Sequence, residues 1–273
     1  MRLLAPAHDA RPVKAEDFDT SSWCQAFARK LAPIVAEHTG PQQLGIGVRG
    51  GIELYIHGLK IHYEIAVRDG VEVVFIKIDV VNAHNSFPRA LAQQNLIDRA
   101  KNDPRLIPLV VACESTLRAH NKIYMRSREN ASGFVYLCDS ESGGGQGNAL
   151  TGIIYAANQD PALKATEAAF PEVEVKAIHD DITLEGPPAR VWGEGGALAF
   201  LVDQLKNRGL TVNQNKFTCL GSTPTACADK PSSIQEATSI QDKDGRVHRA
   251  RGLVICENPI GEEGYVRVSR QQV

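Results

Sequence analysis

The segment VKAIHDDITLEG, residues 175–186, places two adjacent carboxylates between two stretches that both have the pattern of a β-strand. Apolar and β-branched residues recur in 172–178 and in 182–184, so we predict a strand, a tight turn and a second strand, with HDD at the tip. Like charges side by side repel, and a turn needs at most one Asp. The doublet is therefore either a solvated turn or part of a cation site, and the rest of the chain has to decide.

The overall composition is that of an ordinary globular protein, with 273 residues, 43% hydrophobic and 23% charged. The formal net charge of −2 gives no global basic signature of a nucleic-acid-binding protein. No apolar run approaches the ~18 residues needed to span a bilayer, and the N-terminus lacks a signal-peptide core, so no membrane partner is expected. Six cysteines without a CxxC pair predict free thiols in a reducing intracellular compartment, nucleus or cytoplasm, and no secretion.

Hydrophobic periodicity predicts a mixed set of helices and strands. Helices are expected at 21–38, at 88–100, after residue 148 and at 198–209, and strands at 71–80, 133–138, 217–220 and 252–256. Residues 51–67 fit either one helix or a helix followed by a strand, and 232–246 is expected to be a polar insertion or a loop. Because regular βαβ alternation is missing, we predict an α+β fold with a largely antiparallel sheet whose helices pack on one face.

Three acidic residues form the central constellation. Asp79 ends the apolar strand at 71–80, and Asp180 and Asp181 lie at the tip of the later hairpin. If these strands are neighbours in one sheet, the three carboxylates meet at one edge, where their repulsion requires cations. Two divalent ions about 3.5–4 Å apart would make such a site competent for phosphoryl transfer. Oxygen ligands favour Mg²⁺, with Mn²⁺ also possible.

Five further segments give the constellation a family resemblance. In chain order they are IDVVNAHNSFPR (78–89), GGGQGNALTG (143–152), AIHDDITLEGPP (177–188), GLTVNQNKF (209–217) and VICENPIGEEGYV (254–266). Their order and rough spacing resemble the palm motifs of reverse transcriptases, closest to those of non-LTR retrotransposons. ARPVKAED (10–17) and QQLGIGVRGG (42–51) resemble the finger motifs of the same family.

The resemblance implies an RNA-directed DNA polymerase, a nucleotidyltransferase, represented by its fingers and palm. Residues 1–70 would be partial fingers and 71–273 the palm, with the first catalytic strand at 71–80 and the Asp-Asp hairpin at 172–185. A thumb is expected to be absent. The implied partners are an RNA template with primer, dNTPs, and the thumb or nuclease segments of a larger polyprotein.

The motifs also imply a role for individual residues. Asp79 and Asp180 would bind both Mg²⁺ ions, with Asp181 beside them as a weaker or structural carboxylate. The remaining residues would contact substrate: the nascent base pair, the nucleotide sugar, the pyrophosphate and the triphosphate. Gln146 and Gly147 would contact the nascent base pair, and Asn82 and His84 the sugar of the nucleotide. Lys216 would contact the pyrophosphate, and Arg11 with Lys14 the triphosphate.

Three of the motifs depart from the family pattern. His84 stands where the family has Phe or Tyr, the ring that excludes a ribose 2′-hydroxyl, so the preference for dNTP over rNTP is open. Ile178 replaces the aromatic residue of the hairpin motif, and Asn148-Ala149 replaces Asp-Pro. Two alternatives therefore remain beside the reverse transcriptase: an RNA-templated RNA polymerase, and a catalytically silent nucleic-acid-binding relic or scaffold. Such RNA polymerases carry a second acid at the place that His84 occupies, so we rank the RNA polymerase below the reverse transcriptase.

Overall fold

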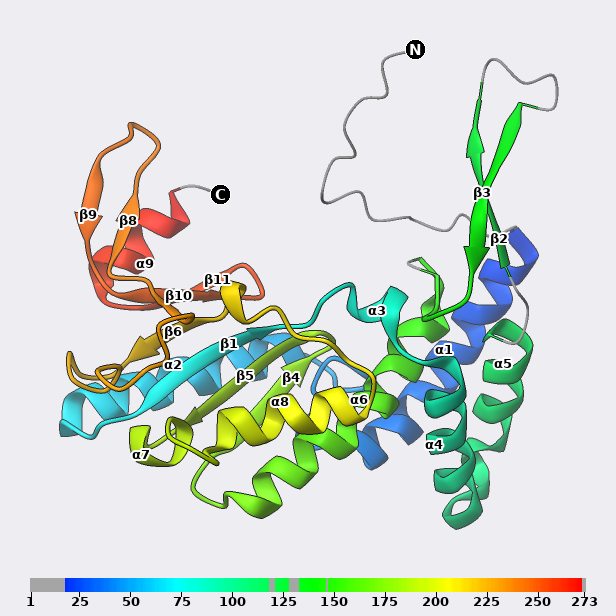
Figure 1. The fold of residues 1–273 in the computed structure, drawn as a ribbon, viewed down its shortest axis with the longest axis horizontal. Helices are drawn as coiled ribbons and strands as arrows, with labels where there is room; N and C mark the ends of the chain where they lie inside the picture. Colours follow the sequence, from blue (N-terminus) through cyan, green and yellow to red (C-terminus); the bar gives the residue numbers. More distant parts are fainter. Residues whose placement is uncertain (1–17, 118–120, 128–132, 146, 272–273) are drawn as a thin grey trace.

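A computed structural model of the chain describes residues 18–117, 121–127, 133–145 and 147–271 (Figure 1). Three residues with predicted substrate contacts, Arg11, Lys14 and Gln146, lie outside this part of the chain. The architecture below is that of the described residues.

The centre of the fold is a five-stranded sheet with the order β4-β5-β1-β6-β7. Its strands are, in that order, Glu174–Ile178, Asp181–Gly186, Val74–Asp79, Thr218–Gly221 and Gln235–Glu236. All neighbours are antiparallel except β6 and β7. The α+β class and the predicted strand–turn–strand at 172–185 are confirmed. Strand β1 takes the central position because it is apolar on both faces.

One face of the sheet carries the larger core. Val74, Ile76 and Ile78 of β1 point into it and are fully buried. Five helices supply the other side of this core: α1 (Phe18–Thr39), α4 (Arg89–Asn102), α5 (Ile107–Leu117), α6 (Ala149–Ala169) and α8 (Ala197–Asn207). The helices predicted at 21–38, 88–100, after 148 and at 198–209 are therefore confirmed.

The opposite face is covered as well, which corrects the expectation that helices pack on one face only. Helix α2 (Gly51–Asp69) lays Tyr55, Leu59 and Tyr63 over Phe75 of β1. The hairpin of β10 (Gly252–Ile255) and β11 (Asn258–Gly261) extends this second core. The ambiguity at 51–67 is thus resolved as one helix, because its buried residues recur every three to four positions.

Two hairpins project from this body on opposite sides of the molecule (Figure 1). One is β2 (Asn121–Arg126) with β3 (Phe134–Ser140), and the other is β8 (Ser239–Gln241) with β9 (Val247–Arg249). The region predicted at 232–246 as a polar insertion or loop contains strands β7 and β8, so the loop alternative is wrong. Short elements complete the fold: α3 (Ala83–Ser86), η1 (Pro104–Leu106), α7 (Pro188–Val191), η2 (Gln214–Lys216) and α9 (Glu263–Arg270).

The predicted division at residue 70 falls between α2 and β1. Helix α1 packs against the sheet face that carries the larger core, and α2 packs against the face that carries the smaller core. The assignment of 1–70 to fingers and 71–273 to palm remains a prediction.

Candidate functional site

The structure brings the three predicted carboxylates to one edge of the sheet. Strands β1 and β5 pair with Asp79 directly opposite Asp181, and Asp180 lies in the turn that precedes β5. Residues directly opposite in an antiparallel pair point to the same face. All three aspartates are half-buried, so their oxygens remain accessible to solvent and ions.

Asp181 has two partners, of which one carries positive charge and the other donates a hydrogen bond. The ammonium of Lys77, also on β1, lies 3.3 Å from Asp181 Oδ1. The Cys256 thiol, at the tip of the β10–β11 hairpin, donates to Asp181 Oδ2 at 3.5 Å. Burial, followed by the nearby Asp181 carboxylate, raises the pKa of Cys256 to about 12, so the thiol keeps the proton that it donates. Lys77 therefore supplies positive charge where a metal ion would.

The three aspartates are neighbours but are not gathered around one point. Within the described ranges, three potential metal ligands with donor atoms within 4.8 Å of one another occur at His62, Glu174 and Glu185, and not at the aspartates. Their donor set, all carboxylate oxygen on one solvent-facing edge, nevertheless suits Mg²⁺ or Mn²⁺.

The hairpin tip is held by a buried glutamine that the sequence interpretation did not assign. Gln43 is fully buried, and its side-chain amide pairs with both backbone groups of His179. The Oε1 atom accepts from the His179 N–H at 2.9 Å, and Nε2 donates to the His179 carbonyl at 3.1 Å. His179 has φ 54°, a left-handed conformation that costs energy for a non-glycine residue. Gln43 thereby stabilises the backbone immediately before Asp180.

Gln43 belongs to a longer buried network. Its Nε2 also donates to Gln159 Oε1 at 2.9 Å, and Gln159 Nε2 donates to the Tyr155 hydroxyl at 3.1 Å. Burial raises the pKa of Tyr155 well above its ordinary value, and the Asp180 charge adds to that effect. Gly45 allows the His179 ring to lie close to this segment, because a Cβ at position 45 would be 2.9 Å from that ring. The glycine-punctuated QQLGIG segment was the available sequence signal.

His84 and Asn82 both follow β1 closely. Asn82 is exposed, with φ 48°, and caps the start of α3. The His84 ring is half-buried, 5.0 Å from the Tyr155 ring and 6.1 Å from the His179 ring, measured between centroids. Burial and then the neighbouring His84 lower the pKa of His179. His84 thus lies beside the hairpin that carries Asp180.

The glycine-rich loop lies against α3. The N–H groups of Gly143 and Gly144 donate to the carbonyls of Phe87 and His84, both at 2.8 Å. A Cβ at Gly143 would lie 2.3 Å from the backbone of Asn85, so glycine is required for this close approach. Gly147 follows with φ 108° and is exposed. The loop residues Gly143 and Gly144 therefore pack directly against α3.

Asn148, one of the departures from the family pattern, has a clear local function. Its side chain accepts from the Leu150 N–H at 2.8 Å and caps helix α6. Asn and Asp are about equally good at this position, so the replacement preserves the helix start.

Lys216 lies in a segment that runs beside the end of β1. The Asn213 N–H donates to the Asp79 carbonyl at 3.0 Å, and Val212 forms a bridge with Val80. Lys216 itself is exposed. The backbone therefore brings this motif next to Asp79, and the role of the Lys216 side chain remains a prediction.

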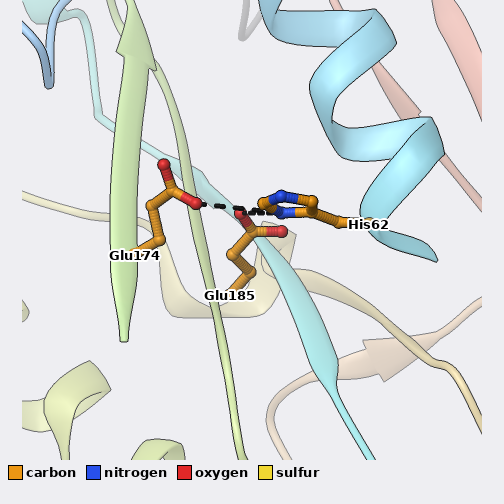
Figure 2. A group of neighbouring side chains, drawn as sticks. All are labelled: His62, Glu174 and Glu185. Carbon is orange, nitrogen blue, oxygen red and sulfur yellow. Dashed lines mark hydrogen bonds and ion pairs between the residues drawn. The ribbon is translucent and has the colours of Figure 1, made fainter. Parts of the chain in front are cut away.

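A second group of titratable residues could hold a metal ion. His62, Glu174 and Glu185 have donor atoms that all lie within 4.8 Å of one another (Figure 2). Burial, followed by the nearby Glu174, raises the pKa of Glu185 to about 9. The sequence interpretation missed this group because its members are far apart along the chain and form no short motif.

Comparisons with known proteins support the fold. The apo telomerase of Candida tropicalis, truncated from its C-terminal domain, matches 91% of this chain and 44% of that chain, with a TM-score of 0.54 at 11% identity. A Candida albicans telomerase in complex with a TWJ fragment of telomeric RNA matches 82% of this chain and 38% of that chain, with a TM-score of 0.53 at 11% identity. The chain spans less than half the length of these structures.

Other comparisons give no match: neither a family model nor a curated protein corresponds to this sequence. Telomerase is a member of the reverse transcriptase family, so the chain has a reverse-transcriptase-like fold. No helix in the described part of the chain is long and apolar enough to cross a membrane.

Proposed function

We propose that the chain is the fingers–palm part of an RNA-directed DNA polymerase of the non-LTR retrotransposon type. The reaction joins the 3′-hydroxyl of a primer to the α-phosphate of a dNTP. The observation that carries the proposal is the pairing of Asp79 directly opposite Asp181, next to the turn that holds Asp180. Acidic residues from two distant motifs meet at one sheet edge, as the two-metal reaction requires.

In this proposal Asp79 and Asp180 hold two Mg²⁺ ions, and Mn²⁺ is an acceptable substitute. The ions would activate the attacking hydroxyl and neutralise charge on the leaving group. Asp181 is a weaker ligand, because it is partly committed to Lys77 at 3.3 Å. Gln43 acts as a positioning residue, since it fixes the backbone of His179 before Asp180.

The nucleotide would bind between the α3 segment and the glycine-rich loop. Asn82 and His84 lie after β1 and would contact the sugar, and Gly147 would contact the nascent base pair together with Gln146. The pyrophosphate would be met by Lys216 and the triphosphate by Arg11, aided by Lys14. Placement of substrate by such contacts lowers the barrier mainly through orientation and charge neutralisation.

The proposed partners are an RNA template with its primer and dNTPs. Support comes from the Candida telomerases, which were solved with a fragment of telomeric RNA. Thumb or nuclease segments of a larger polyprotein would complete the grip on the duplex. Five described cysteines carry free thiols, which favours a reducing intracellular compartment.

A primer-extension assay on a poly(rA)/oligo(dT) duplex with Mg²⁺ tests the proposal. The 273-residue chain should extend the primer, Asp79→Ala should abolish extension, and Asp203→Asn, which removes an exposed carboxylate on α8, should not. Equal extension by Asp79→Ala and wild type would contradict the assignment. Failure of the wild type to extend the primer, even with a thumb supplied, would also contradict it. In that case, template binding that does not depend on Mg²⁺ or on Asp180 would identify the catalytically silent relic.

An RNA-templated RNA polymerase is the second candidate, favoured by one observation. His84 packs against Tyr155 at the place where the family has the aromatic ring that excludes ribonucleotides. An imidazole can instead hydrogen-bond a 2′-hydroxyl. Preference for rNTP over dNTP, reversed by His84→Phe, would select this candidate.

A further inference from the structure

A histidine and two glutamates gather on the second face of the sheet, at the opposite end of β5 from the aspartates. His62 comes from α2, Glu174 begins β4, and Glu185 lies near the end of β5. The two glutamates are direct partners in the β4–β5 register, so both point to the face that α2 covers. Figure 2 shows the imidazole directed at both carboxylates. Glu185 is four residues from Asp181 along β5, about 13 Å at ~3.3 Å per residue.

The spacing of the donor atoms suits a tetrahedral ion. His62 Nδ1 lies 3.1 Å from Glu185 Oε1 and 3.8 Å from Glu174 Oε2. Ligands of a tetrahedral zinc ion, with bonds of about 2.0–2.2 Å, lie ~3.3–3.5 Å apart. The observed separations bracket that value. Small side-chain rotations would therefore bring all three atoms to bonding distance of one ion.

A second, independent observation concerns Glu185. Its side chain is nine-tenths buried, and no donor group among the described residues serves its Oε2 atom; burial, followed by a proton shared with the Glu174 carboxyl, raises the pKa of Glu185. A buried carboxylate oxygen without a partner costs free energy, which a bound cation would recover. Glu174 differs, because its Oε1 atom is already occupied by the Lys176 ammonium at 2.7 Å. The Lys176 ammonium also lies 3.5 Å from Glu167 Oε1, so its positive charge is shared between Glu174 and Glu167.

Solvent reaches the group from one side. The His62 side chain is 54% exposed, and a cavity of about 400 Å³ adjoins all three residues. Apolar side chains, among them Val71 and Pro187, line most of the rest of this cavity, together with the carboxylate of Glu172. An ion could enter and keep a water molecule as its fourth ligand.

We propose that His62, Glu174 and Glu185 bind one Zn²⁺ ion, with the fourth position open to the cavity. Imidazole nitrogen and carboxylate oxygen are both ligands of zinc in proteins, whereas Mg²⁺ prefers oxygen alone. The ion joins α2 to the β4–β5 hairpin, whose other end carries Asp180. This site is separate from the proposed magnesium site and does not depend on the proposed reaction.

Calorimetric titration of the EDTA-treated, desalted 273-residue chain with ZnCl₂ tests the inference. We expect one Zn²⁺ per chain, a rise in melting temperature of several degrees, and the visible absorption of tetrahedral Co²⁺ when cobalt replaces zinc. MgCl₂ should give none of these effects. His62→Gln and Glu185→Gln should each weaken zinc binding at least tenfold.

Two control variants show whether zinc binds at this group and not elsewhere on the chain. His57→Gln removes an exposed histidine from the same helix and should bind zinc like the wild type. Asp79→Asn should also bind zinc normally, whatever its effect on primer extension. Because His62 is largely exposed, His62→Gln should fold, which circular dichroism can verify. Absence of zinc binding, or binding that both His62→Gln and Glu185→Gln retain unchanged, would overturn the proposal and leave an ion pair.

Discussion

Strand β5 carries an acidic residue near each end of the same face, and the two ends hold their charge in different ways. At one end Asp181 is half-exposed and faces Asp79, with a lysine ammonium 3.3 Å away. At the other end Glu185 is buried and faces Glu174, with an imidazole at 3.1 Å. The first end keeps its carboxylates apart, whereas the second gathers its donor atoms within 4.8 Å.

Access to water explains this difference. Half-exposed carboxylates are hydrated, so they can remain charged and separate until a hard, hydrated cation draws them together. A buried carboxylate has little water to rely on and needs a proton, a histidine or a tightly bound ion nearby. The same residue class on one strand can thus serve an exchangeable ion at one end and a resident ion at the other.

The largest effect should come from the hairpin tip. We expect Asp180→Asn to lower primer extension on the order of a thousandfold or more, because an amide cannot supply the charge that a divalent metal requires. Asp181→Asn should cost less, roughly ten- to hundredfold, since Asp181 is partly engaged by Lys77. Single-turnover rates at saturating Mg²⁺ measure both. An equal loss in the two variants would remove the proposed ranking of the ligands.

Gln43→Ala should have the next largest effect. The change leaves the buried His179 backbone and Gln159 without their partner, which we expect to lower the free energy of unfolding by about 2–4 kcal/mol. Primer extension should fall as the turn before Asp180 loosens. Urea denaturation and the extension assay measure the two effects.

The neighbouring Gln42 provides a matched control for that prediction. Gln42 is also buried, but its side chain bonds Glu167 and not the hairpin tip. Gln42→Ala should therefore destabilise the fold while extension per folded molecule stays close to wild type. Equal losses of extension in the two variants would mean that Gln43 has no special positioning role.

A smaller effect is expected for Lys77→Met. Lys77 competes with metal ions for Asp181, so its removal should lower the Mg²⁺ concentration for half-maximal extension by a few-fold. Stability without Mg²⁺ should fall by about 1 kcal/mol or less, because the pair is partly exposed. A magnesium titration compares it with Lys101→Met, which breaks an exposed pair on α4 and should not shift the midpoint. A shift to higher Mg²⁺ in Lys77→Met would show that the lysine assists metal binding.

The smallest effect concerns helix α2, which covers the glutamate end. Gly58 lies inside α2, and a Cβ there would meet nothing within 4 Å, so Gly58→Ala should stabilise the chain by about 0.5–1 kcal/mol. Gly144→Ala, beside the aspartate end, should destabilise it, since the added Cβ would lie 2.2 Å from Thr151 Oγ1. Thermal unfolding measures both, and a stabilised Gly144→Ala would contradict the close loop packing described for the aspartate end.

Local patterns predicted much of this fold but left some elements open. The run VEVVFIKIDV predicted β1 because β-branched residues and a terminal acid are a local signal. Residues 51–67 stayed ambiguous, since Ile, Leu and Tyr fit a helix or a strand equally well until the tertiary structure selects the buried face. Helix α5, which went unpredicted, is largely apolar and lacks a clear amphipathic pattern.

The residues of the candidate site also differ in whether the sequence alone could predict them. Asp79, Asp180 and Asp181 were identified because each lies at the end of a recognisable strand in a recognisable order. Gln43 could not be assigned, because its function depends on contact with His179, which is remote in sequence. The substrate roles of His84, Asn82, Gly147 and Lys216 remain predictions, although their backbone segments lie around the aspartate end.

The amino-acid order by itself predicted strands β1, β4 and β5, the turn with its two acids and the resemblance of the motifs, because these depend on neighbours within a few residues. Only the tertiary structure decided that Asp79 faces Asp181, that Gln43 holds the turn, and that His62 meets two glutamates. Those contacts follow from strand register and from helix α2 packing on the second sheet face, and both depend on how distant segments bury their apolar surface together.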